Sequence, residues 1–458
     1  MATLDASARL ERLPFRGPVL RLVLIIALGG FFELYDLFLT TYIVPTLLKD
    51  GIYSLKTANI FDMHAVASFV AALFLGMFVG AGLLGRLPDR FGRKAVFTYA
   101  LIGYSVCTLV MAFQTEALWI NIWRFLAAVG IGLEQVTIVT YTSELVASRY
   151  RGRAIALTQT ISFVAMPVVA TVSWLLIPHA FLGLEGWRWV VILGALGAVF
   201  IWVLRRALPE SALWLESKGR HAEASEVLDR LESQVYGDRS PPPAAVSREA
   251  PAAPPPASLD GRRWAALFGP GVRRLVLMMV VVNVCITVGY YGFASWVPTL
   301  LVSKGITTVK SLEYSLLMAV AAPLAPLLSM LVADRIERKL QVMLSCTFCA
   351  VLGLAFAAQS VPAVVIVLGF LLTLNNGWMS SSYHTYQAEL FPVAIRAQAV
   401  GFVYSWSRFS AVFCAYVISY LLARYGNAGV FAFITGSMLL IVLTLWRFGP
   451  KTNRLVSR

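Results

Sequence analysis

Apolar stretches long enough to cross a lipid bilayer recur along almost the whole chain, from Leu20 to Phe448. Each holds roughly 20 residues, which is the length that an α-helix needs to cross the hydrocarbon core of a membrane. Hydrophobic residues make up 59% of the sequence and charged residues only 14%, so a soluble domain of this length could not keep its surface in water. The sequence therefore predicts an all-α membrane protein with about twelve transmembrane helices.

The expected spans form two groups of six, separated by a long polar segment. The first group is expected at 20–48, 63–87, 95–113, 117–146, 154–178 and 188–208. The second group is expected at 273–302, 311–333, 340–359, 362–391, 397–424 and 428–448. The first stretch is too long for a secretory signal and lacks a small-residue cleavage site, so we expect it to persist as a spanning helix.

These spans divide the chain into five segments. A cytoplasmic N-terminus at 1–19 precedes a six-helix bundle at 20–208, and a second bundle at 273–448 precedes a cytoplasmic C-terminus at 449–458. Between the bundles, 209–272 is expected to hold an amphipathic cytoplasmic helix over 209–234. A disordered Pro/Ala-rich linker is then expected over 240–258, because that composition cannot bury enough apolar surface to fold.

The basic residues lie mainly between the spans. With both termini inside the cell, most of the 38 Lys and Arg fall in cytoplasmic segments, which is the positive-inside pattern of membrane proteins. The net charge of +14 is thus explained by topology, and no nucleic-acid partner is expected. All five cysteines lie in apolar stretches, where cysteine behaves as a small hydrophobe. We expect an integral protein of a bacterial-type inner membrane, surrounded by lipid.

Charged motifs of the first group recur in the second group at one constant offset. The recurring pairs are Asp89 and Asp334, Arg93 and Arg338, Glu144 and Glu389, and Arg151 and Arg396. Because each group holds an even number of helices, the two repeats have the same orientation and are related by an axis along the membrane normal. The sequence therefore predicts two parallel six-helix repeats with a cavity at their interface.

The loop from Gly85 to Lys94 reads GRLPDRFGRK and closely resembles the signature loop of the major facilitator superfamily. Its second copy, which ends at Lys339, lacks both glycines. Other motifs are similar to the sugar-porter and organic-ion-transporter branch, namely Arg124 with Gly130 and Gly132, Pro209-Glu210-Ser211, and Glu389-Leu390-Phe391-Pro392. The resemblance implies a twelve-helix fold with cytoplasmic termini.

The seventh span departs from the sugar-porter pattern. The paired glutamines that sugar porters usually carry there are missing from the segment between Asn283 and Gly292. A hexose substrate is therefore disfavoured. The segment is instead similar to bacterial transporters of niacin, aromatic acids and other organic ions.

Ionisable side chains inside a membrane cost roughly 2.5–3.5 kcal/mol each, so each one is a candidate functional residue. Asp36 resembles the titrating aspartate of proton-coupled sugar porters, and the resemblance implies that it pairs with Arg124 of the fourth span. Movement of the guanidinium away from Asp36 would favour proton uptake by the carboxylate. Glu33 lies near the same helix face and is a second candidate acid. The alternative is a permanent ion pair that ties the first span to the fourth.

Arg408 resembles the arginine on the eleventh helix of organic-anion transporters, where the planar guanidinium suits a substrate carboxylate. An internal ion pair is the alternative for this residue. The other expected substrate-binding residues are Glu134, Asn283, Tyr290, Tyr291, Asn375, Asn376, Trp378 and Gln159. Any of these polar groups could instead hold helices together, and a packing or gating role is at least as plausible for His384.

The cytoplasmic charges form a separate group of candidates. By resemblance they form a latch that holds the inner face shut in one conformation and separates in the other. Charges that only set the topology are the alternative. The expected gating residues are Asp89, Arg93, Glu144, Arg151, Asp334, Arg338, Glu389 and Arg396.

The sequence holds no phosphate loop, metal-ligand spacing or nucleophile motif, so we expect neither an enzyme nor an ATP-driven pump, and no cofactor or metal. We predict a monomeric secondary active transporter that works by alternating access. The expected partners are a small organic anion, such as a carboxylate or an aromatic acid, and a proton carried in symport. The alternatives are a proton antiporter that exports organic cations or drugs, a sugar transporter, and a membrane sensor, which the short linker disfavours.

Overall fold

The computed structural model describes residues 6–55, 62–204, 208–237, 267–270, 272–333, 336–391 and 396–451. Within these ranges, ten helices are long and apolar enough to cross a membrane. One of them, α19 (Arg396–Phe448), contains two spans that meet at Gly426, where φ is 63°. The apolar helix α9 (Gly186–Leu204) adds another span. The described residues thus form the twelve spans that the sequence predicts.

The first half of the molecule runs from α2 to α9. Its spans are α2 (Pro18–Lys49), α3 (Val66–Phe78) with the π-helical turn η1 (Val79–Leu83), α5 (Arg93–Met111), α6 (Ala117–Leu145), α7 (Arg151–Phe163) with α8 (Ala165–Leu176), and α9. The connecting elements are α4 (Leu87–Phe91), the 3-10 turn η2 (Ser148–Tyr150) and an antiparallel hairpin of β1 (Ala180–Phe181) and β2 (Leu184–Glu185).

The second half repeats this pattern without a hairpin in its described residues. Its spans are α13 (Val272–Ala294) with α14 (Val297–Ser303), α15 (Thr308–Ala319) with α16 (Leu324–Ala333), α17 (Arg338–Ala358), α18 (Pro362–Leu390), and the two parts of α19.

Prolines explain two of the breaks within spans. Pro167 has no N–H to donate to the carbonyl group of Phe163, and the chain breaks between α7 and α8 at that point. Pro323 likewise cannot donate to Ala319, where α15 ends. Each of these two spans is therefore made of two shorter helices.

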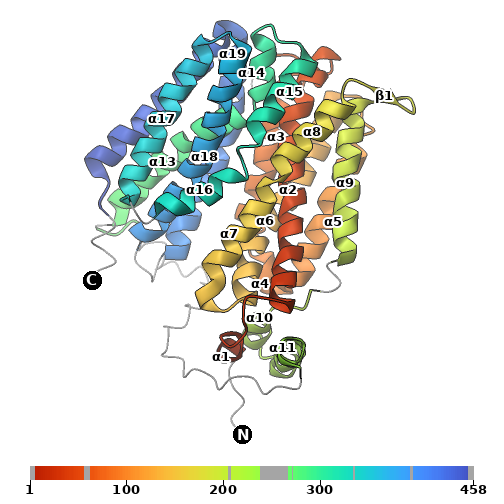
Figure 1. Cartoon of the computed structure of the whole chain (residues 1–458), viewed down its shortest axis with the longest axis vertical. Helices are drawn as coiled ribbons and strands as arrows, with labels where there is room; N and C mark the ends of the chain where they lie inside the picture. Colours follow the sequence, from red (N-terminus) through yellow and green to blue (C-terminus); the bar gives the residue numbers. More distant parts are fainter. Residues whose placement is uncertain are drawn as a thin grey trace.

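The two halves lie side by side (Figure 1). They contact each other through α8 with α15, α2 with α14, and α3 with α19. The rings of Phe74 and Tyr291 meet across this interface, with centroids 4.6 Å apart. Helices α8, α14 and α15 lie at the end of the bundle opposite to α1 (Ala6–Leu10), α10 (Ala212–Ser217) and α11 (His221–Tyr236) (Figure 1).

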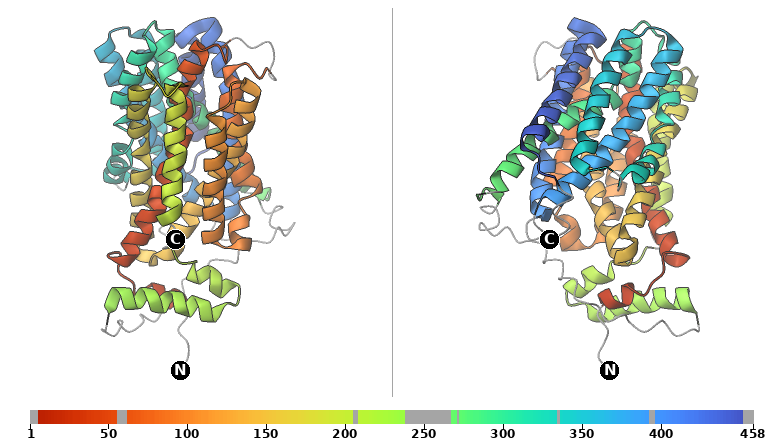
Figure 2. Two further views of the ribbon diagram at one scale, coloured as in Figure 1. Left: turned by 90° about the vertical axis from the view of Figure 1, so that its right-hand side faces the viewer. Right: turned by 60° about the vertical axis from the view of Figure 1, so that its left-hand side comes forward.

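Helices α1, α10 and α11 lie across one end of the first half (Figure 2). The sequence predicts a single helix over 209–234, but the structure has two, because Gly219 adopts a φ of 73° between them. Arg9 of α1 forms ion pairs with Asp229 and Glu232 of α11, at 2.6 and 2.5 Å. These ion pairs join α1 to α11, and α11 also contacts α2 of the first half. The linker predicted over 240–258 lies outside the described residues.

Candidate functional site

A fully buried ion pair lies inside the first half, between α2 and α6. Arg124 Nη1 donates to Asp36 Oδ2 at 2.9 Å, and Arg124 Nη2 donates to the main-chain oxygen of Asp36 at 2.6 Å. Thr108 of α5 donates to the other carboxylate oxygen at 3.2 Å. Two charges removed from water persist together only if their remaining polar atoms are hydrogen-bonded, as most of these are. The first and fourth spans are therefore joined at the residues expected from the sequence.

A second buried guanidinium, Arg408 of α19, lies at the interface between the halves. Within its own half it donates to the hydroxyl groups of Tyr291 at 2.6 Å and Tyr404 at 2.7 Å. Its Nη2 also donates to Gln135 Oε1 of the first half at 2.7 Å. Arg408 is only 3% exposed, and its Nε has no hydrogen-bond partner among the described residues. A carboxylate is the ligand that best fits a guanidinium surrounded by neutral acceptors.

Two buried acids lie near Arg408 on the first half. Glu33 of α2 is 3% exposed and Glu134 of α6 is fully buried. Glu33 is close enough to Glu134 and Arg408 for their charges to interact, and Gln135, the neighbour of Glu134, accepts from Arg408 Nη2 at 2.7 Å. The interface therefore combines one cation with two acidic groups.

A small cavity opens between the halves. Tyr42, Phe163 and Met166 line it from the first half, and Tyr290 and Asn376 line it from the second. Asn376 Nδ2 is buried there without a hydrogen-bond partner among the described residues. An aromatic and mainly apolar lining with a few polar groups is typical of small-molecule sites.

Other candidate residues make contacts within the second half. Asn283 donates to Gln387 at 2.7 Å, which joins α13 to α18. Asn375 donates to the main-chain oxygen of Ser345 at 2.9 Å, and Trp378 donates to Gln341 at 3.3 Å; both contacts join α18 to α17. These bonds are typical of polar groups that hold membrane helices together.

Two remaining candidates have exposed side chains. Gln159 lies on α7 and His384 on α18. The His384 ring packs against the rings of Tyr383 and Tyr404, with centroids 4.1 and 5.3 Å away. His384 is therefore linked to Arg408 through Tyr404.

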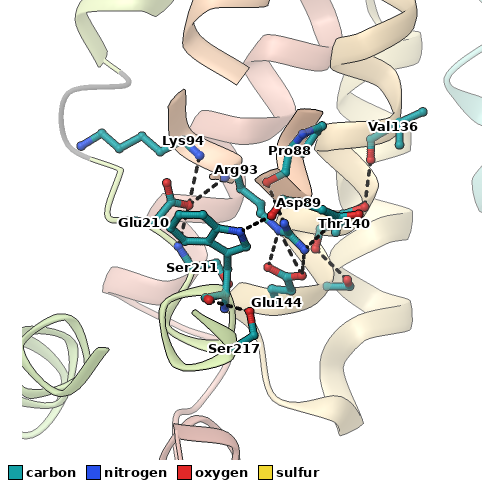
Figure 3. A network of polar contacts seen from close by, with 12 residues as sticks. Pro88, Asp89, Arg93, Lys94, Val136, Thr140, Glu144, Glu210, Ser211 and Ser217 are labelled. Atoms are coloured by element: carbon teal, nitrogen blue, oxygen red, sulfur yellow. Dashed lines mark hydrogen bonds and ion pairs between the residues drawn. The ribbon is translucent and has the colours of Figure 1, made fainter. Parts of the chain in front are cut away.

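The expected gating charges of the first half form a compact network (Figure 3). Arg93 forms ion pairs with Asp89 at 2.8 Å and Glu144 at 2.9 Å. Glu210 Oε1 accepts hydrogen bonds from the main-chain N–H groups of Arg93 at 2.9 Å and Lys94 at 3.2 Å. The carboxylate thus caps the N-terminus of α5, where the helix dipole favours a negative charge.

The other expected gating residues are less completely described. Arg151 donates to the main-chain oxygen of Ser143 at 3.0 Å, and Arg338 pairs with Glu389 at 3.5 Å within the second half. Asp334 and the side chain of Arg396 lie outside the described residues. Each described ion pair of this group joins helices of one half.

Sequence reasoning assigned no contact to four residues that the structure brings into these networks, namely Thr108, Gln135, Tyr404 and Glu210, the last of which was noted only as part of a motif. For two of them, the position in the sequence indicated a contact with a candidate site residue. Tyr404 precedes Arg408 by one helical turn, and Gln135 is a polar residue inside an apolar span beside Glu134.

A family model described as "Sugar (and other) transporter" matches residues 22–456 of the chain. The chain belongs to this family of transporters. It is 33% identical to the putative metabolite transport protein YyaJ of Bacillus subtilis over 98% of this chain and 96% of the relative. It is 29% identical to the niacin transporter NiaP of Acinetobacter baylyi, over 98% of each chain.

Solved structures agree with this assignment at the level of the fold. The xylose transporter XylE of Escherichia coli, in a partially occluded inward-open conformation, superposes with a TM-score of 0.73. The alignment covers 95% of this chain and 98% of that chain, at 18% identity. The protein is therefore an integral membrane transporter with the major facilitator fold, and its relatives are transporters rather than enzymes.

Proposed function

We propose that the protein is a proton-coupled symporter of a small organic anion and works by alternating access in a bacterial inner membrane, with both termini in the cytoplasm. The observation that carries the anion preference is the environment of Arg408. Its acceptors are two tyrosine hydroxyl groups and one amide oxygen, all neutral, and Nε is unpaired in the described part of the chain. An incoming carboxylate would replace weaker neutral acceptors with a charge-assisted, two-point contact.

The Asp36–Arg124 pair is the proposed coupling site. Its 2.9 Å contact holds the carboxylate ionised while the guanidinium is beside it. Separation of the two groups during the conformational cycle would leave a desolvated acid that binds a proton. The name of one solved neighbour, a D-xylose–proton symporter, supports proton coupling as a property available to this fold.

Tyr290 and Asn376 supply the proposed contacts to the rest of the substrate. One lies on α13 and the other on α18, and both line the cavity between the halves. An aromatic face and an amide suit a planar ring with a ring heteroatom. The printed name of the niacin transporter relative is consistent with an aromatic carboxylate of this kind.

The gating proposal concerns the charges at the end of the bundle that carries α10 and α11. Arg93 and Arg338 are each held by acids of their own half. Exchange of these partners between the halves would close this end of the protein during the cycle. Arg93 and Glu144 are largely buried in their pair, and ion pairs that form a network contribute more than single surface pairs.

Uptake by purified protein in liposomes tests the proposed function. The substrates are labelled nicotinate, benzoate, xylose and a quaternary ammonium ion, each with and without an inward proton gradient. We expect the carboxylates to accumulate only with the gradient and a protonophore to abolish accumulation. Accumulation of xylose alone would establish the sugar alternative, and cation movement against the proton flow would establish the antiporter.

A further inference from the structure

A groove runs along the side of the first half, between α5 and α6 and beside α4. Its volume is about 580 Å³, which is within the range of small-molecule sites, and its lining is made mainly of aliphatic and aromatic side chains. Two of the lining residues, Phe91 and Tyr99, are 56% and 74% exposed. Because α5 and α6 both cross the membrane, the groove opens toward lipid.

Small residues create this groove. Ala95, Ala100 and Gly103 line it from α5, and a Cβ added at Gly103 would meet no atom within 4 Å. At Gly130 of α6, an added Cβ would come within 3.0 Å of the main-chain oxygen of Ala100, so the two helices approach closely there. This close approach forms the floor of the groove, and Gly103 leaves the space above it open.

The length of the groove matches one leaflet of a bilayer. Its lining on α5 extends from Ala95 to Cys107, which is roughly 18 Å at a rise of about 1.5 Å per residue. The hydrocarbon core of a membrane is about 30 Å thick, so one leaflet contributes about 15 Å. An apolar groove of this length, which begins near one end of a span, suits the acyl chain of a lipid.

Two arginines lie at the end of the groove where α5 begins. The guanidinium carbon of Arg90 is 5.2 Å from the centre of the Phe91 ring, which lines the groove. Arg86 lies one helical turn before Arg90. Both arginines are exposed, and neither has an ion-pair partner in the ranges that the structure describes. The groove therefore combines an apolar length with positive charge at one end.

The acids near these arginines are bound to other groups (Figure 3). Asp89 and Glu144 form ion pairs with Arg93. Glu210 accepts hydrogen bonds from the main-chain N–H groups of Arg93 and Lys94. The two arginines thus remain available for an anion from outside the protein.

We propose that this groove binds an anionic phospholipid, with one acyl chain between α5 and α6 and the phosphate group beside Arg86 and Arg90. Guanidinium groups bind phosphate through two parallel hydrogen bonds, and basic sites at the ends of membrane helices are typical of anionic lipid headgroups. A zwitterionic lipid also carries a cationic group, which two arginines would repel. The inference requires only that the protein spans the membrane, and it is independent of the transported substrate.

A second copy of the chain is the alternative occupant of an apolar surface of this kind. Two copies in the same membrane orientation, related by a two-fold axis, would present the same patch to each other. Each copy would then bring its own Arg86 and Arg90 to the same end of the contact. The like charges oppose this arrangement, whereas a lipid phosphate neutralises them.

Native mass spectrometry of the purified full-length protein in detergent tests the proposal. The probes are dioleoyl phosphatidylglycerol, phosphatidylcholine and phosphatidylethanolamine, and glycerol 3-phosphate as a phosphate group without acyl chains. We expect the first phosphatidylglycerol to bind more tightly than either zwitterionic lipid. Glycerol 3-phosphate should not compete with it, because the groove contributes through the acyl chain.

Three variants separate the phosphate contact from the acyl-chain contact. The double variant Arg86→Gln/Arg90→Gln should bind phosphatidylglycerol about 30-fold more weakly, since each basic residue near a headgroup contributes about fivefold. Gly103→Leu fills the groove and should weaken binding while both arginines remain. Arg447→Gln is the matched control, because Arg447 is 5.3 Å from the ring of the exposed Phe448 and neither residue lines the groove.

Four results would overturn the inference. The first needs no variant, so it holds even if the variants fail to fold: native protein that binds the three lipids equally well. The second is binding of phosphatidylglycerol that is unchanged in the double arginine variant or in Gly103→Leu. The third is full competition by glycerol 3-phosphate, which would assign the arginines to free phosphate. The fourth is a dimer that Gly103→Leu converts to a monomer, which would assign the groove to a second copy.

Discussion

Arg188 and Lys304 bind equivalent main-chain carbonyl groups in the two halves of the protein. Arg188 Nη1 donates to the oxygen of Ala112 at 2.6 Å, and Lys304 Nζ donates to the oxygen of Ala357 at 2.9 Å. Each cation also binds the carbonyl group of the glutamine two residues later, at 2.7 Å in both cases. These positions are related by the same offset as the charged loop motifs.

The two cations come from different places in the chain. Arg188 lies at the start of α9, whereas Lys304 follows α14. The third span of each half thus ends in a similar cation site, where the helix dipole favours a positive charge. The carbonyl groups are part of the sequence repeat, but the cations that bind them are not.

Replacement of Lys304 by methionine is expected to destabilise the protein. Lys304 also donates to the main-chain oxygen of Phe356 at 2.9 Å, so three acceptors lose a charged donor together. Hydrogen bonds to charged groups contribute about 1.5–3 kcal/mol, and we expect a loss of free energy of unfolding in that range. Thermal unfolding in detergent measures it, with Lys310→Met at an exposed position of α15 as control. Equal melting temperatures for the two variants would show that the cap contributes nothing.

Asp36→Asn is expected to separate substrate movement from proton movement. The amide keeps the shape of the carboxylate, so exchange of substrate across the membrane should continue. Uphill accumulation driven by a proton gradient should be lost, because the residue can no longer bind and release a proton. Substrate uptake and substrate exchange in liposomes check this for Asp36→Asn. Thr108→Val is measured in parallel. Accumulation and substrate-induced proton flux that both survive would exclude the coupling role of Asp36.

Arg408→Lys is expected to weaken carboxylate binding about 10- to 100-fold, which corresponds to roughly 1.4–2.8 kcal/mol. Lysine keeps the positive charge but loses the planar pair of donors that matches a carboxylate. The dissociation constant for nicotinate, measured by calorimetry, tests this. Arg424→Lys, an exposed position near the other end of the same span, is the control. An unchanged dissociation constant would place Arg408 outside the substrate site.

Glu210→Ala is expected to loosen the start of α5. The carboxylate caps the N–H groups of Arg93 and Lys94, and removal of an N-terminal cap costs about 1 kcal/mol. Hydrogen exchange at these two amides should become faster, while the middle of α5 is unchanged. Glu223→Ala, on the exposed face of α11, provides the comparison. Exchange at the native rate would show that Glu210 is not the cap.

Gly92→Ala should perturb the same network more strongly. Gly92 adopts a φ of 101°, and a Cβ there would lie 2.4 Å from Glu210 Oε2. Backbone strain and this clash both act against the folded loop. We expect a lower melting temperature than for Gly103→Ala, since Gly103 has open space around it. A melting temperature as high as that of Gly103→Ala would mean that the loop accommodates a side chain.

Much of the fold can be predicted from features of the sequence that need no knowledge of tertiary contacts. The length of each apolar stretch sets the number of spans, since every backbone polar group in lipid must be satisfied within a helix. The Asp36–Arg124 contact was also predicted, from the resemblance of Asp36 to the titrating aspartate of proton-coupled sugar porters. The single helix predicted over 209–234 was wrong, since hydrophobic periodicity alone did not reveal the break at Gly219.

The sequence by itself determined the membrane class, the spans, the repeat and the small set of polar residues inside the membrane region. Only the tertiary structure decided which of them meet. Asn375 and Asn376 are neighbours in one span, yet the first bonds Ser345 in α17 and the second lines the cavity between the halves. Successive residues of a helix point about 100° apart, and α18 is contacted on several sides, so its sequence carries no sign of which side faces the cavity. The contact of Gln135 with Arg408 depends in the same way on how the two halves pack.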